Sequence, residues 1–275
     1  MMNNSIKTSK INSLGELIEL VTPKETDPDS GRLRESAVFR GMPNKDWKLL
    51  SSLDRLGYPD QPPHLKSHLE EHLLRNFIRH ARAYIKITPS ELWEWLVIAQ
   101  HRGLPTRLLD WTYSPLIAAH FAVLNGDPKI DRVIWKLNWK LIHEKFHVQP
   151  YVLNAYEFND ELKNHEISSL WNLMTESKEI KNSFVCLVEP SALDPRVVTQ
   201  SAAFTISSDK TKSLDSILMN KGLSHALVKY IIPSNRVDYI RDQLDICSID
   251  ERHMFPDLGG VASELTRYYS SSSQI

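Results

Sequence analysis

The sequence has little cysteine, almost no net charge and no long apolar run, and each shortage excludes a class of protein. Cys186 and Cys247 are the only cysteines and form no Cys-x-x-Cys pair, which favours a reduced, cytoplasmic chain over a disulfide-stapled secreted one. No apolar run approaches the roughly 20 residues that span a bilayer. The polar start MMNNSIKTSKIN lacks the apolar core of a signal peptide. We therefore expect a cytoplasmic protein with no membrane partner.

Charge and histidine spacing also argue against two common kinds of site. The net charge of −1 gives no sign of a nucleic-acid or membrane surface, although a local basic cleft is compatible with a balanced total. His64, His68 and His72 recur every four residues on an expected helix, but no cysteine or acidic ligand set accompanies them. We interpret them as a solvated polar stripe and expect no metal.

Periodicity and turn residues predict an α+β fold. The 275 residues suit one large domain or two small ones. Helical spacing and caps predict helices over 13–21, 64–85, 90–103, 114–126, 213–220 and 234–246, with a last one after 256. Alternating apolar residues predict strands over 36–41, 131–138, 183–190, 196–207 and 225–233, while 42–63 and 140–182 look irregular. Helices thus dominate the first half and strands the second, which is typical of the α+β class.

One stretch, HRGLPTRLLDWTYSPLIAAHFAV over 101–123, concentrates polar residues where a helix begins. Pro105, Thr112 and Ser114 predict a rigid joint between an extended segment and this helix. Arg107 and Asp110 are more polar than a packed joint requires. Because sites are built from polar groups held on rigid elements, we interpret this corner as both a structural joint and part of a binding site.

Each polar residue of the corner also has a structural interpretation. Arg40, at the end of the 36–41 strand, would form an ion pair with a buried acid such as Asp110, and Arg107 would lock the corner by a salt bridge. Asp110 would cap the turn through its own backbone, and Ser114 would cap the helix. Trp111 would pack in the core. The sequence leaves both interpretations open.

Four blocks of the sequence resemble one family, the FRG domain, which is named for Phe-Arg-Gly. VFRGMPNKDWKLLSSLDR over 38–55 resembles its first block, and AQHRGLPTRLLDWTYSPLIAAHFA over 99–122 resembles its second. RVVTQSAAF over 196–204 and MFPDLGGVASEL over 254–265 resemble its later elements. The resemblance divides the chain into an N-terminal helix and loop (1–35), an FRG domain (36–265) and a flexible tail (266–275).

The resemblance implies a fold and an activity. The family consists mostly of bacterial proteins with suggested roles in phage defence or as toxins, and a relationship to ADP-ribosyltransferases has been suggested. This implies a helical N-terminal half packed on a mainly antiparallel, ADP-ribosyltransferase-like sheet. It further implies an enzyme that binds NAD and cleaves its nicotinamide–ribose bond. The acceptor would be a protein, a nucleic acid, a small molecule or water, and an inhibitor or defence-system partner would regulate it.

The same resemblance assigns site residues. The implied catalytic residues are Arg40, His101, Asp110 and Gln200, and the implied NAD-binding residues are Arg40, Gly41, Arg107, Trp111, Thr112 and Ser114. Arg40 would bind a phosphate through two hydrogen bonds of its guanidinium group, and Gly41 would let the phosphate come close to the backbone. Gln200 or Asp110 would face the reacting ribose, where oxocarbenium character develops, but Gln200 is not a carboxylate.

The remaining roles are less specific. Thr112 and Ser114 would brace the nicotinamide ribose. His101 would act as a general acid or base, and its structural alternative is a histidine that bonds the last carbonyls of a helix.

Two other functions compete with the enzyme hypothesis. A non-catalytic nucleotide or nucleic-acid sensing module would bind its ligand without turnover. A hydrolase or nuclease that uses His101 with Asp110 would lose activity in His101→Ala and would be indifferent to NAD.

Overall fold

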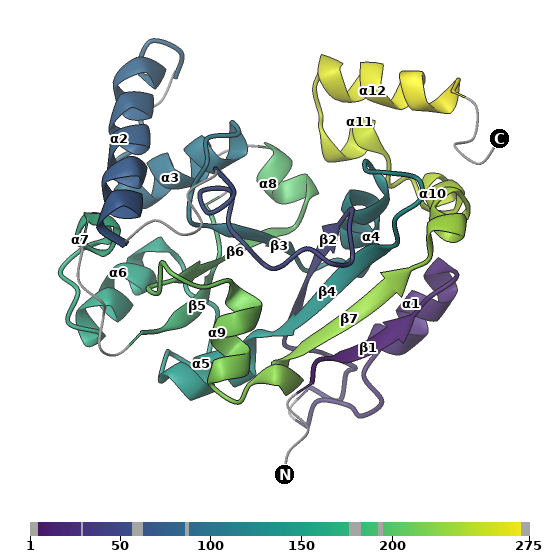
Figure 1. Ribbon diagram of the computed structural model, residues 1–275, viewed down its shortest axis with the longest axis horizontal. Coiled ribbons are helices and arrows are strands. Elements are labelled where there is room, and N and C mark those ends of the chain that lie inside the picture. The colour runs from purple at the N-terminus through teal and green to yellow at the C-terminus, as the bar shows by residue number, and fades with distance from the viewer. Residues whose placement is uncertain are drawn as a thin grey trace.

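A seven-stranded sheet forms the centre of the molecule in the computed structural model, which describes residues 5–28, 30–56, 63–85, 88–175, 183–191 and 195–270 (Figure 1). The strands are β1 (Lys7–Lys10), β2 (Ala37–Met42), β3 (Leu109–Thr112), β4 (Arg132–Asn138), β5 (Val185–Val188), β6 (Ala202–Ser207) and β7 (Leu227–Ile232). Their order is β1-β7-β4-β2-β3-β6-β5. All neighbours are antiparallel except β1 and β7, which are parallel.

Helices cover both faces of the sheet. One face packs on α1 (Leu14–Val21), α4 (Pro115–Val123) and α10 (Val237–Ile246). The other packs on α2 (Pro63–Ala81), α3 (Leu92–His101), α5 (Trp139–Phe146), α6 (Ala155–Asn164), α7 (Leu170–Thr175) and α9 (Leu214–Asn220). Three further helices are α8 (Pro195–Thr199), α11 (Glu251–Met254) and α12 (Leu258–Tyr268), of which α11 and α12 lie at the upper right of Figure 1.

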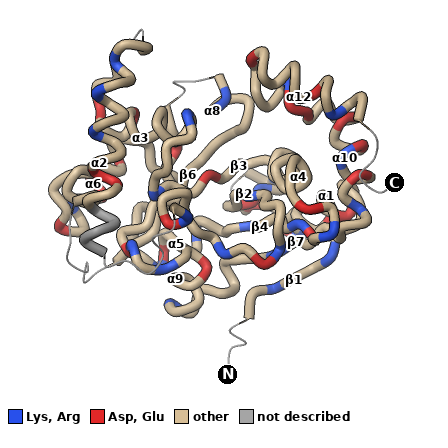
Figure 2. The backbone as a smooth tube through the Cα atoms, turned by 45° about the horizontal axis from the view of Figure 1, so that its top comes forward, with Lys and Arg blue, Asp and Glu red and all other residues tan. Residues whose placement is uncertain are grey.

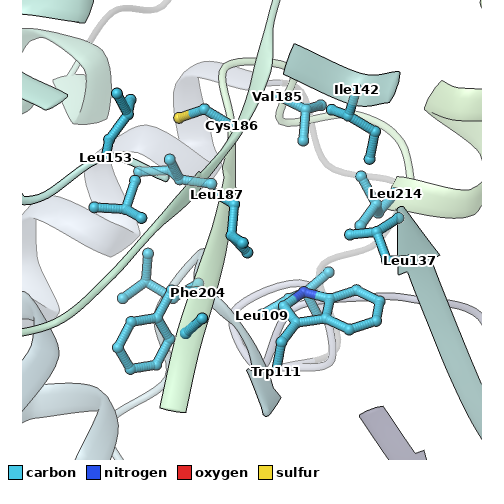
Figure 3. Close-up of a cluster of buried hydrophobic side chains, with 14 of the residues drawn as sticks. Leu109, Trp111, Leu137, Ile142, Leu153, Val185, Cys186, Leu187, Phe204 and Leu214 are labelled. Carbon is cyan, nitrogen blue, oxygen red and sulfur yellow. The ribbon is translucent and has the colours of Figure 1, made fainter. Parts of the chain in front are cut away.

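The strand residues alternate between two hydrophobic cores. In β2, Phe39 points into the core under α1, α4 and α10, whereas Val38 and Met42 belong to the larger core on the other face. The larger core includes Trp111 of β3 and Phe204 of β6, which Figure 3 shows among leucines from several elements. Because both faces of the sheet are covered, β5 is buried along its whole length and β4 along most of it.

The structure confirms the α+β class and most of the predicted elements. Ser114 caps α4 by accepting a hydrogen bond from the backbone N–H of Ile117 at 3.3 Å, and Pro115 occupies the first helical turn. Helices dominate the first half, as expected. The second half was expected to be rich in strands, but α5 to α12 give it more helix than strand. β1 was not expected at all.

Two segments depart from the sequence predictions. Residues 196–199 belong to α8 rather than to a strand, and the positive φ of 45° at Ser201 separates this helix from β6. The segment 140–175, expected to be irregular, contains α5, α6 and α7, while 176–182 lie outside the described residues. α12 continues to Tyr268, so the proposed tail begins inside a helix.

Acidic and basic residues are interspersed along most elements of the tube in Figure 2, in agreement with the net charge of −1. None of the helices in the described part of the chain is both long and apolar enough to cross a membrane.

Candidate functional site

The candidate site lies where two neighbouring strands part. β2 and β3 pair at a single position, Phe39 opposite Thr112. Beyond it, Arg40, Gly41 and Met42 pair only with β4, and the first residues of β3 pair only with β6. Because the ladder between the two strands stops there, side chains and backbone groups from both edges face a common opening.

A cavity of about 320 Å³ occupies this opening. Its size is in the range of small-molecule sites. The lining residues come from β2, α3, β3, α4, α8, β6 and the segment after α11: Arg40, Gly41, Gln100, His101, Asp110, Trp111, Thr112, Phe121, Arg196, Gln200, Ala202, Phe204 and Phe255. The four sequence blocks quoted above therefore meet at one cavity.

Asp110 and Arg40 form the polar centre of the cavity. Arg40 Nη1 donates to the backbone carbonyl of Asp110 at 2.6 Å and contacts its Oδ2 at 3.3 Å. The Arg40 side chain is 13% exposed and that of Asp110 is 51% exposed. The ion pair considered as the structural interpretation of Arg40 is thus present, and it lies inside the cavity lining. Arg40 thus donates to the Asp110 backbone carbonyl, which lies beyond the single position at which β3 pairs with β2, and holds the Asp110 carboxylate where it is exposed to solvent.

A hydrogen-bond relay orients Asp110 from its other side. Gln100 Nε2 donates to both carboxylate oxygens at 2.9 Å. The orientation of this amide is fixed because its Oε1 accepts from Thr106 Oγ1 at 2.6 Å. Thr106 Oγ1 in turn accepts from the backbone N–H of Leu108 at 3.1 Å. Donors thus reach Asp110 from Gln100 and Arg40, and together they fix the orientation of its carboxylate.

An aromatic wall forms another part of the cavity lining. Phe121 and Phe255 meet edge to face with ring centroids 6.2 Å apart, and the Arg196 guanidinium lies 5.5 Å from the centre of the Phe255 ring. Arg196 also forms an ion pair with Asp257. Gln200 Nε2 donates to the Met254 carbonyl at 3.0 Å, so its amide joins the start of β6 to α11. The cavity thus combines cations, one carboxylate and flat apolar rings.

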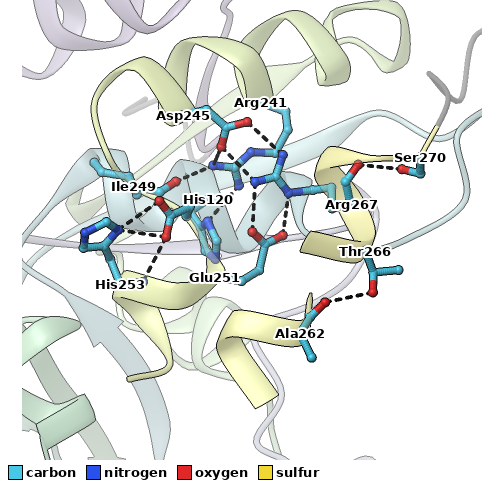
Figure 4. A network of polar contacts seen from close by, with 11 residues as sticks. His120, Arg241, Asp245, Ile249, Glu251, His253, Ala262, Thr266, Arg267 and Ser270 are labelled. Atoms are coloured by element: carbon cyan, nitrogen blue, oxygen red, sulfur yellow. Dashed lines mark hydrogen bonds and ion pairs between the residues drawn. The ribbon is translucent and has the colours of Figure 1, made fainter. Parts of the chain in front are cut away.

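Behind this wall, a charged network holds α4, α10, α11 and α12 together (Figure 4). His120, the neighbour of Phe121, receives a hydrogen bond on Nδ1 from Arg241 Nη1 at 2.8 Å. Burial, and then the Arg241 charge, lower the pKa of His120 to about 4, so the imidazole is neutral. Burial alone would lower the pKa of Arg267, but its hydrogen bonds to Glu251 and Asp245 outweigh burial and raise that pKa.

Gly41 has a packing role that its sequence context did not predict. An added Cβ would lie 1.8 Å from the carbonyl oxygen of Ala118 and 2.5 Å from the backbone nitrogen of Ala122. The close approach that Gly41 makes in this structure is that of helix α4. Nearby, Thr112 Oγ1 accepts from the Ser114 N–H at 3.1 Å, so both residues build the strand-to-helix joint.

Two of the expected ligand residues have structural partners. Arg107 lies outside the cavity and forks onto Glu70 of α2 through Nε, at 2.8 and 2.9 Å, and through Nη2; both side chains are buried. Trp111 borders the cavity but is buried, and its indole N–H donates to Thr205 Oγ1 at 2.9 Å. Their structural interpretations, a locking salt bridge and core packing, describe both residues. His101 ends α3 and borders the cavity.

The lining residues that the site assignment missed are Gln100, Phe121, Arg196, Ala202, Phe204 and Phe255. Each lies within one of the quoted blocks, so a signal was present in the resemblance. Gln200 was expected on a strand, but it follows α8 and precedes β6.

The described residues include no group of three or more His, Cys, Asp or Glu side chains placed to hold a metal ion. His68 and His72 lie on α2, and the side chain of His64 lies outside the described residues.

Fold and site together define a mixed α/β protein with a polar and aromatic cavity at a split in its sheet. Residues 35–130 match the family model of the FRG domain, and the chain therefore contains an FRG domain. The matched part includes β2, α2, α3, β3 and α4, which supply Arg40, Gln100 and Asp110 to the cavity. No curated protein and no solved structure gives a significant match to the chain.

Proposed function

We propose that this protein binds NAD in the cavity between β2 and β3 and cleaves the bond between nicotinamide and ribose. The observation that carries the proposal is a half-exposed carboxylate, Asp110, which Arg40 and Gln100 hold at the cavity surface. From the family resemblance we propose a role in bacterial defence or as a toxin.

The lining chemistry suits a dinucleotide. The guanidinium groups of Arg40 and Arg196 supply planar donors for a pyrophosphate. Phe121, Phe204 and Phe255 offer faces and edges against which a nicotinamide or adenine ring would pack. A cavity lined by both features suits a ligand that is anionic in the middle and flat at its ends.

The proposed step is a substitution at C1′ of the nicotinamide ribose. The C1′–N1 bond breaks and nicotinamide leaves with the bonding electron pair. Water or another acceptor forms the new bond to C1′ and loses its proton to solvent. Cationic charge develops on the ribose during this step, and a fixed carboxylate beside it lowers the barrier.

Asp110 is the better candidate for this carboxylate role than Gln200. Gln200 carries no charge, and its amide is engaged by the Met254 carbonyl. Asp110 carries the charge and has half of its side-chain surface exposed. We therefore assign charge stabilisation to Asp110, phosphate binding to Arg40 and Arg196, and an architectural role to Gln200.

The test is release of nicotinamide from NAD by the purified protein, followed by NMR. We expect Asp110→Asn to lower the rate by at least about 100-fold, because it removes the charge and keeps the shape. Asp160→Asn is the matched control, since Asp160 is also an exposed carboxylate paired with a cation, Lys163, and lies outside the cavity lining.

Binding is measured separately by titration of NAD. We expect Arg40→Ala to weaken binding by about 10- to 100-fold, through loss of charge-assisted hydrogen bonds. Arg75→Ala, which removes an exposed arginine of α2, should bind as the wild type does. If Arg40→Ala binds and turns over NAD as the wild type does, the assignment is wrong.

A second function, nucleotide binding without catalysis, is favoured by one observation. Both carboxylate oxygens of Asp110 already accept hydrogen bonds from Gln100, which suits a structural carboxylate as well as a catalytic one. Saturable, Arg40-dependent binding of NAD with no release of nicotinamide over hours would select this function.

A further inference from the structure

The last helix, α12, is oriented with its polar side inward and its apolar side outward. Gly260 is buried, and Glu264 and Arg267 are partly buried, on the side that faces the body of the protein. Leu258, Val261, Leu265, Tyr268 and Tyr269 are exposed, and the fractions reach 87% for Leu258, 50% for Leu265 and 70% for Tyr268. The spacing of three and four residues puts them on one helical stripe.

The inward side of α12 is fixed in place. An added Cβ on Gly260 would lie 2.0 Å from the Phe255 carbonyl oxygen, so the helix packs through its backbone. Arg267 donates to Asp245 at 2.8 and 2.9 Å and to Glu251 at 2.6 and 3.0 Å (Figure 4). Glu264 pairs with Arg252 at 3.4 Å. These contacts prevent α12 from rotating to bury its apolar stripe, so the exposure is built into the fold.

The stripe is self-complementary about a two-fold axis. Two copies of α12 packed antiparallel with their axis at residue 263 place Leu258 opposite Tyr268 of the second copy, and Val261 opposite Leu265 of the second copy. The only charged residues of the helix, Glu264 and Arg267, are turned inward and paired. No like charges oppose each other at such an interface, and the stripe lacks the cationic flank of a membrane-surface helix.

The exposed area is close to what a dimer of standard size needs. With roughly 200 Å² for each fully exposed large side chain, the stripe offers on the order of 600 Å² per chain, against about 800 Å² per partner in a standard interface. Neighbouring exposed residues of the same helix, such as Ala262 and Thr266, supply further contact area.

We propose that this protein forms a two-fold dimer through antiparallel packing of α12 against α12 of a second copy. The interface lies one helix away from each cavity, because α12 is tied to α11, and α11 is followed at once by Phe255 of the aromatic wall. The proposal is independent of the ligand that the cavity binds.

The test is the mass of the full chain in solution, by sedimentation or by light scattering, over a series from about 1 to about 100 µM. The chain has a mass of 31.7 kDa, and we expect twice that value at the higher concentrations. Leu265→Asp should give the monomer mass, because it buries an unpaired charge. Ser263→Asp is the control on the same helix, because Ser263 is exposed on another side, and it should remain dimeric.

A mixing experiment tests the antiparallel register. Val261→Lys alone should also be monomeric, but a mixture with Leu265→Asp should form a heterodimer, since the introduced ammonium group of one chain then meets the introduced carboxylate of the other. Circular dichroism of each variant confirms that the fold is kept. A wild-type chain that is monomeric throughout, a dimeric Leu265→Asp, or a mixture that stays monomeric would each overturn the proposal.

Discussion

Replacement of Gly41 by alanine should destabilise the protein far more than a single methyl group usually does. Gly41 lies on β2, directly beneath α4, and the added Cβ would meet the Ala118 carbonyl oxygen at 1.8 Å and the Ala122 nitrogen at 2.5 Å. Ordinary contact begins at 3.4 Å. Helix α4 would therefore have to retreat from the sheet by about 1.6 Å, and the atoms in its way are backbone atoms that no rotamer change can move.

The expected loss follows from this displacement. Overpacking by one methylene usually costs about 1–3 kcal/mol when side chains can adjust, so a clash with helix backbone should cost at least about 3 kcal/mol. The retreat would also open gaps along Phe39, Ala119 and Ile134, which form the core under α4. For a chain of this size, a loss of about 3 kcal/mol lowers Tm by roughly 6–12 °C.

The assay is a thermal melt followed by circular dichroism, with Gly15→Ala as the matched control. Gly15 is an exposed residue of helix α1, and an added Cβ there would have only Ser13 Oγ as a neighbour, at 3.8 Å. Its replacement should raise the free energy of unfolding by about 0.5–1 kcal/mol, because glycine is a poor helix former. A Gly41→Ala variant that melts with the wild type would refute the close packing of α4 on β2.

Two further predictions concern buried charge. Glu70→Gln should lower the free energy of unfolding by roughly 3–5 kcal/mol, because it leaves the buried Arg107 without its anionic partner. A denaturant titration measures this loss. A binding titration should show that the NAD affinity of the folded protein is unchanged. His120→Gln should flatten the dependence of the unfolding free energy on pH. In the wild type the pKa of His120 is about 4 in the folded chain, against 6.5 in the unfolded chain. The unfolded chain therefore binds a proton first as the pH falls from 6.5 toward 4, and the wild type loses up to about 3 kcal/mol of stability over this range. An unchanged slope of unfolding free energy against pH in the variant would contradict this origin.

Local signals predicted the elements that have clear caps or alternation, and they failed where tertiary contacts decide. Ser114 and Pro115 specify the start of α4, and the alternating residues over 131–138 predict β4. β1 is a short edge strand with the polar sequence KTSK, and only its pairing with β7 makes it a strand. Its sequence therefore contains no apolar alternation from which a strand could be predicted. Val197 and Val198 favour a strand by propensity, but Pro195 begins a helix there.

The site was predictable in its polar members and less so in its walls. Arg40 and Asp110 stand out because charged residues beside apolar strands need partners, and the structure pairs them. The capping box of Asn154 and Glu157 is a readable signal for α6, although 140–182 was predicted to be irregular. No local rule could show that Phe255 reaches the cavity, since its sequence distance from β2 exceeds two hundred residues and only the fold joins them.

The most direct test of the proposed site is a crystal structure of the protein with bound NAD or a non-cleavable NAD analogue. We predict the pyrophosphate against Arg40 and Arg196, and the nicotinamide ribose beside the Asp110 carboxylate, in the cavity between β2 and β3. A ligand bound elsewhere, or a pose that leaves Asp110 away from the ribose, would contradict the account.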